Sequence, residues 1–71
     1  MELIVERWER KIEKTEYGEA ELETVVEEKI VDSEEEALSI AEEWKSIKET
    51  TKVTLHYHYH DEGKPCERKE L

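Results

Sequence analysis

Three histidines alternate with two tyrosines at residues 56–60, in the sequence HYHYH. Alternate positions of a β-strand lie about 6.5–7 Å apart on one face, and imidazoles at that spacing can converge on one metal ion. We therefore predict His56, His58 and His60 as candidate metal ligands. Glu67 adds a carboxylate ligand if a return strand places it opposite His58.

The competing interpretation is that these imidazoles only form the polar face of a sheet whose other side is the core. The sequence lacks the cysteine clusters and the Glu-x-x-His motif that make a metal assignment specific. A milder role is pH sensing, because neighbouring imidazoles gain charge below about pH 6.5. Phosphate-binding glycine loops are absent, and we predict no cofactor.

Cys66 is the only cysteine, and its thiol can be a nucleophile only if His58 or His60 acts as its base. Such chemistry also needs an orienting group and an oxyanion pocket, for which so small a two-layer domain offers little concavity. We therefore interpret Cys66 as a small, half-buried hydrophobic residue. We predict no catalytic residues and no enzyme activity. A lone cysteine cannot form an internal disulfide, which suits the reducing cytoplasm.

The strongest compositional signal is acid, because Asp and Glu outnumber Lys and Arg by 21 to 11 and give a net charge of -10. This charge repels nucleic acid and anionic lipid and attracts a basic protein. No apolar segment is long enough to span a membrane. The predicted partner-binding residues are Glu34, Glu35, Glu36, Glu42 and Glu43 in one group, and Glu16, Glu19, Glu21 and Glu23 in another. The alternative is that these charges only keep a small domain soluble.

In size and acidity the chain resembles small phage-encoded anti-defence proteins, including anti-CRISPR inhibitors. The two glutamate groups carry this resemblance, and no sequence motif supports it. The resemblance implies an inhibitor or regulator that imitates DNA and binds a basic, nucleic-acid-handling protein. Two alternatives stay open: a metal-binding or homodimeric module that uses the histidine face, and a designed protein without a biological partner.

These candidate residues are positioned by the fold, which we predict to be a single domain covering residues 1–71. A helix is predicted at 33–50. Ser33 is its N-cap, and Glu36, three residues later, completes a capping box. The glutamates that follow Ser33 also favour the positive end of the helix dipole. An apolar stripe at helical spacing then supplies the buried face: Ala37, Ile40, Ala41, Trp44 and Ile47.

The segment before this helix is predicted as a β-hairpin at 3–31, although the spacing of Ile4, Trp8 and Ile12 also fits a helix. A three-residue turn at 16–18, with Gly18 in the left-handed conformation, makes both faces consistent. One face then pairs Ile4 with Ile30, Trp8 with Val26 and Ile12 with Leu22, and the other pairs Arg7 with Glu27 and Lys11 with Glu23. The like-charge pairs Glu6–Glu28 and Glu13–Glu21 count against this register.

This register leaves an apolar patch on the exposed sheet face, which could seal a homodimer or dock a partner: Leu3, Val5, Val25 and Val31. After the helix, strict alternation predicts a second hairpin at 52–71, with a turn at 61–64 and a short edge strand from Cys66 to Leu71. Its helix-facing residues are Val53, Leu55, Tyr57 and Tyr59. We therefore predict an α+β fold, ββαββ, with an antiparallel sheet in the order 2-1-3-4 and one helix on one face.

Overall fold

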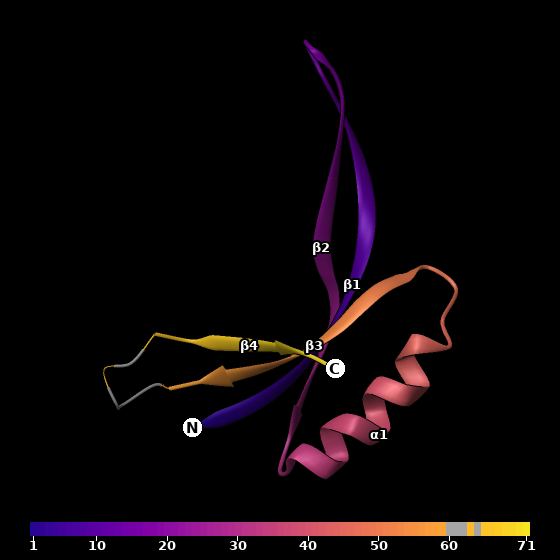
Figure 1. Cartoon of the computed structure of the whole chain (residues 1–71). Coiled ribbons are helices and arrows are strands. Elements are labelled where there is room, and N and C mark those ends of the chain that lie inside the picture. Colours follow the sequence, from indigo (N-terminus) through magenta and orange to yellow (C-terminus); the bar gives the residue numbers. More distant parts are fainter. Residues whose placement is uncertain (60–62, 64) are drawn as a thin grey trace.

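The computed structural model describes residues 1–59, 63 and 65–71, and shows a four-stranded antiparallel sheet with one helix packed on one face (Figure 1). The elements are β1 (Glu2–Thr15), β2 (Gly18–Val31), α1 (Glu34–Lys45), β3 (Thr50–His58) and β4 (Glu67–Glu70). The strand order is β2-β1-β3-β4. The predicted fold class and strand order are confirmed.

The first hairpin follows the predicted register only at its open end, where Ile4 lies opposite Ile30 and Arg7 lies opposite Glu27. Beyond Arg7 the register shifts by one residue, so that Trp8 lies opposite Val25. Val26 is therefore the extra residue of a β-bulge. The predicted pairs Trp8–Val26, Ile12–Leu22, Lys11–Glu23 and Glu13–Glu21 are wrong for this reason.

The turn of this hairpin also differs from the prediction. Thr15 pairs with Gly18, which leaves a two-residue turn instead of a three-residue one. The Thr15 hydroxyl donates to the Gly18 carbonyl at 2.9 Å and accepts from the Tyr17 N–H at 3.3 Å. Gly18 has a φ of 123°, a conformation that other residues rarely adopt.

The helix packs on the predicted face of β3, where Val53 and Leu55 are buried, but it covers the face of the first hairpin opposite to the one expected. Val5 lies opposite Leu55 in the pairing of β1 with β3, and residues directly opposite each other share a face. The buried core therefore consists of Val5, Val31, Ala37, Ile40, Ala41, Trp44, Val53 and Leu55. Val5 and Val31 belong to this core, and Leu3 packs against it, so none of the three is exposed. The apolar patch that suggested a homodimer therefore does not exist as predicted. Only Val25, opposite Trp8, lies on the open face.

Ser33 is the N-cap of α1 as predicted, and its hydroxyl accepts a hydrogen bond from the Glu36 N–H at 3.2 Å. This bond satisfies a donor that a helix start leaves without a partner inside the helix. The Glu36 carboxylate reaches back one residue further than in a capping box, because it accepts from the Asp32 N–H, at 3.1 Å, and not from the Ser33 N–H.

The helix ends at Lys45, five residues before the predicted end. The Ser46 hydroxyl donates to the Glu43 carbonyl at 2.6 Å, and the Thr50 hydroxyl donates to the Trp44 carbonyl at 3.0 Å. These side chains satisfy carbonyls that further helical turns would otherwise have used. The chain can therefore leave the helix and enter β3 at Thr50.

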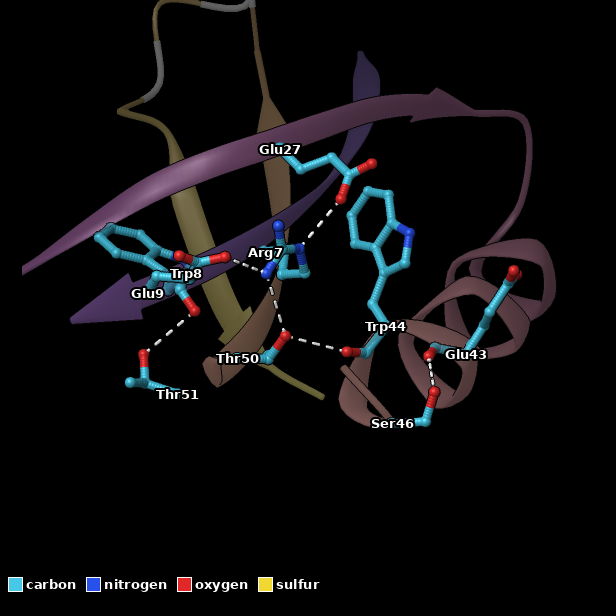
Figure 2. A network of polar contacts seen from close by, with 9 residues as sticks. All are labelled: Arg7, Trp8, Glu9, Glu27, Glu43, Trp44, Ser46, Thr50 and Thr51. Carbon is cyan, nitrogen blue, oxygen red and sulfur yellow. Dashed lines mark hydrogen bonds and ion pairs between the residues drawn. The ribbon is translucent and has the colours of Figure 1, made fainter. Parts of the chain in front are cut away.

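Arg7 joins the hairpin to the end of the helix (Figure 2). Its guanidinium donates to Glu27 at 2.9 Å and to Thr50 at 3.3 Å, and it also bonds Glu9. The hydrogen bonds that Arg7 donates to Glu9, and then those to Glu27, raise the pKa of Arg7. Figure 2 shows Trp44 beside this network, so Arg7 lies between the core and the solvent.

Candidate functional sites

Half of the first hairpin projects beyond the rest of the sheet as a two-stranded arm, residues 10–23 (Figure 1). The pairing of β3 with β1 ends where Thr50 meets Glu9, so no third strand supports this arm. It exposes three large hydrophobic side chains, with fractional exposures of 57% for Ile12, 98% for Tyr17 and 46% for Leu22. A two-stranded hairpin alone is marginally stable in water.

The arm carries four of the predicted partner-binding glutamates. Glu16 lies in the turn, and Glu19, Glu21 and Glu23 alternate along β2 and share one face. Glu21 lies 3.9 Å from Arg10, and Glu23 lies 3.1 Å from Lys52. Such exposed ion pairs contribute little free energy, so a partner's cations can replace them.

The other five predicted glutamates are exposed on α1, away from the arm. Two of them have structural roles: Glu34 accepts a hydrogen bond from the Tyr57 hydroxyl at 2.7 Å, which raises the pKa of Tyr57, and Glu36 caps the helix. In the described part of the chain, Glu35, Glu42 and Glu43 form no ion pair. The structure does not bring the two groups of glutamates together.

The predicted histidine ligands lie on the open face of the sheet. His56 and His58 share this face, and their ring centroids lie 5.3 Å apart in an edge-on arrangement. His60 and most of the predicted turn at 61–64 lie outside the described residues. The prediction for Glu67 is wrong, because Glu67 pairs with Tyr57 and not with His58.

Cys66 takes the place expected for Glu67. Continuing the β3–β4 register by one residue places it opposite His58, and its Sγ lies 2.9 Å from the His58 Nδ1. Cys66 is exposed, which contradicts the predicted half-buried hydrophobic role. One nitrogen each from His56 and His58 and the Cys66 sulfur all lie within 4.8 Å of one another.

A buried carboxylate next to this cluster was missed by the sequence reasoning. Glu6 is 2% exposed although no helix covers its side of the sheet. It accepts hydrogen bonds from the Arg68 Nε at 2.8 Å and from the Thr54 hydroxyl at 3.0 Å. The Thr54 hydroxyl accepts in turn from the Trp8 indole N–H at 2.8 Å. One signal in the sequence indicated this site. Two like charges, Glu6 and Glu28, are paired across the strands, and such a pair needs a cation nearby.

The charge state of Glu6 follows from these contacts. Burial alone would raise its pKa, but the hydrogen bonds from Arg68 and Thr54 and the positive charge of Arg68 outweigh burial and lower the pKa. Glu6 is therefore a fixed negative charge on the open face. His56 Nδ1 lies 3.6 Å from its Oε2.

No family model, curated protein or solved structure matches this chain. No helix among the described residues is long and apolar enough to cross a membrane. No pocket is present in the described part of the chain. The candidate functional surfaces are the projecting arm, the helix glutamates and the histidine face.

Proposed function

We propose that this chain is a small acidic binding protein that uses the arm to bind a basic, nucleic-acid-handling protein and to inhibit or regulate it. One observation carries the proposal: β2 is an outer strand whose free edge runs along an unsupported arm with glutamate at every second position from Glu19 to Glu23.

The free edge supplies the backbone part of the interaction. β2 has 14 residues and pairs on one side only, with β1. On its other side the strand presents N–H and C=O groups that an extended segment of a partner can pair with. Long open edges promote unwanted pairing, and proteins usually shorten or cover them. An edge of this length therefore favours a role in binding.

The charges on the edge select the kind of strand that fits. A second copy of β2 would bring glutamates close to glutamates, and like charges across a strand pair are unfavourable. A partner segment with lysine or arginine at alternate positions would instead gain ion pairs with Glu19, Glu21 and Glu23. The surface therefore fits a basic protein better than a second copy of this chain.

A protein that normally binds nucleic acid has such a basic surface. The alternate glutamates of β2 lie about 6.6–6.8 Å apart and form a row of negative charges on one face. Such a row supports electrostatic competition with nucleic acid, with association rates that fall as salt rises. The single reduced cysteine favours the cytoplasm as the place of action.

The test is a pull-down from nuclease-treated lysate at low and high salt, followed by identification of the bound proteins. The variant Glu21→Lys/Glu23→Lys changes the arm, and Glu42→Lys/Glu43→Lys changes the net charge equally on the helix. We expect the arm variant to lose a basic nucleic-acid-binding protein that the wild type and the helix variant retain at low salt. Equal loss in both variants would mean that only net charge matters. Loss in the helix variant alone would move the site to α1.

A further inference from the structure

We propose that His56, His58 and Cys66 form a Zn²⁺ site on the open face of the sheet, with Glu6 as the residue that positions His56. This site is independent of the proposed binding arm. Its ligands lie on β3 and next to β4, and it binds a metal ion instead of a protein. Imidazole nitrogen and thiolate sulfur are both donor atoms that bind zinc in proteins.

The three side chains need only small movements to reach the geometry of a zinc site. Zinc binds imidazole nitrogen at about 2.0–2.1 Å and thiolate sulfur at about 2.3 Å, so tetrahedral ligand atoms lie roughly 3.3–3.6 Å apart. Here the His58 Nδ1 and Cys66 Sγ lie 2.9 Å apart, and one ring nitrogen of each histidine lies within 4.8 Å of the other and of the Cys66 sulfur. Rotation of these side chains closes the difference, because Cys66 is exposed.

The orientation of His56 points to a ligand at its Nε2. This atom is buried, and it has no hydrogen-bond partner among the described residues, which is costly for a polar atom. The other ring nitrogen, Nδ1, faces the Glu6 carboxylate at 3.6 Å. We assign the ring proton to Nδ1, where the carboxylate attracts it, so that the Nε2 lone pair is free to bind a cation.

Glu6 has the features of a residue that supports a metal ligand. Histidine ligands commonly direct their second N–H toward a carboxylate, which fixes the ring and strengthens the metal bond. Glu6 is itself held by Arg68 and Thr54, so its position does not depend on the metal. Glu6 does not touch the ion and acts through His56.

Binding has two consequences for the chain. Cys66 must lose its thiol proton to the solvent, because the thiolate is the form that binds zinc. The ion also joins β3 to the residue before β4, a strand of four exposed residues. The fourth coordination position is left for water.

The experiment titrates the full-length chain with Co²⁺, a coloured substitute for zinc, in a reducing buffer, and then displaces it with Zn²⁺. We expect a thiolate-to-cobalt charge-transfer band with the intensity of tetrahedral coordination. Cys66→Ser should abolish this band, and His56→Ala and His58→Ala should each weaken binding by more than the 10–100-fold typical of supporting residues. Glu67→Gln is the matched control and should leave binding unchanged. A band that persists in Cys66→Ser, or binding that is insensitive to both histidine variants, would overturn the site.

The role of Glu6 has a separate readout. Glu6→Gln should keep the charge-transfer band and weaken Zn²⁺ binding about 10–100-fold, while Glu28→Gln, an exposed carboxylate on the same face, should not. Circular dichroism of each variant establishes that it is folded, and Thr54→Val, which removes one bond to Glu6, serves if Glu6→Gln is unfolded. Unchanged affinity in the folded Glu6 or Thr54 variant would refute the positioning role but leave the three ligands in place.

Discussion

Glu6 and Arg68 meet on the sheet face opposite the helix, where the guanidinium donates two hydrogen bonds to the carboxylate, at 2.8 and 3.2 Å. The carboxylate side chain is 2% exposed and that of the arginine is 49% exposed. The arginine thus covers a charge that the helix does not reach. The contact ties β4 to β1 across the intervening strand β3.

We expect Glu6→Gln to lower the free energy of unfolding by about 1.5–3 kcal/mol, the value of hydrogen bonds to a charged group. The loss stays within this range because Arg68 is half exposed and water can solvate it. Urea denaturation without added metal measures the change, with Glu28→Gln as the control. A change equal to that of the control would show that the pair does not support the fold.

The assignment of the core face can be tested with two apolar truncations. Leu55 is 1% exposed under the helix, whereas Ile12 is 57% exposed on the arm. Leu55→Ala should cost about 2–5 kcal/mol, because it leaves a cavity in the core. Ile12→Ala should change stability by less than about 0.5 kcal/mol. Similar costs in chemical denaturation would mean that Ile12 is packed as closely as Leu55.

The helix cap predicts a third result. Ser33→Ala removes the acceptor of the Glu36 N–H and should cost about 0.5–2 kcal/mol. Ser39 is exposed in the middle of α1, so Ser39→Ala provides the matched control and should be neutral or slightly stabilising, since alanine is the better helix former. Thermal unfolding compares the two. Equal melting temperatures would exclude a stabilising role for the cap.

The turn of the arm predicts a local effect. Gly18→Ala meets no steric contact, but it forces an L-residue into a φ of 123°, at a cost of about 1 kcal/mol. Because no third strand supports the arm, we expect this cost to appear as about fivefold faster amide exchange in residues 12–22, with little change in the melting temperature. Ala20→Gly is a comparison that leaves the turn intact. A large fall in the melting temperature would show that the arm unfolds together with the core.

The sequence was sufficient where the signals are local. The N-cap at Ser33, the alternation of β3 and the register at Ile4 and Ile30 all follow from neighbouring residues. The bulge at Val26 did not, because one extra residue in a strand of alternating charges leaves no periodic trace. The early end of the helix depends on side-chain bonds from Ser46 and Thr50 to carbonyls, which propensity does not reveal.

The choice of core face in the first hairpin failed for a non-local reason. Both faces of β1 carry apolar residues, and the pairing of Val5 with Leu55, fifty residues later, decides which face meets the helix. The candidate metal site shows the same limit. Alternation predicted His56 and His58, but the contribution of Cys66 depends on the register across a turn, and that of Glu6 depends on the position of β1 beside β3.

The central position of β1 also sets an order of assembly. Its hairpin with β2 closes through a two-residue turn, a step of about 1–10 µs, whereas pairing Glu2 with His58 must close almost the whole chain. Until β3 arrives, the hairpin has two open edges and an uncovered apolar face. Mutual repulsion among the glutamates of the hairpin opposes the pairing of these open edges between chains.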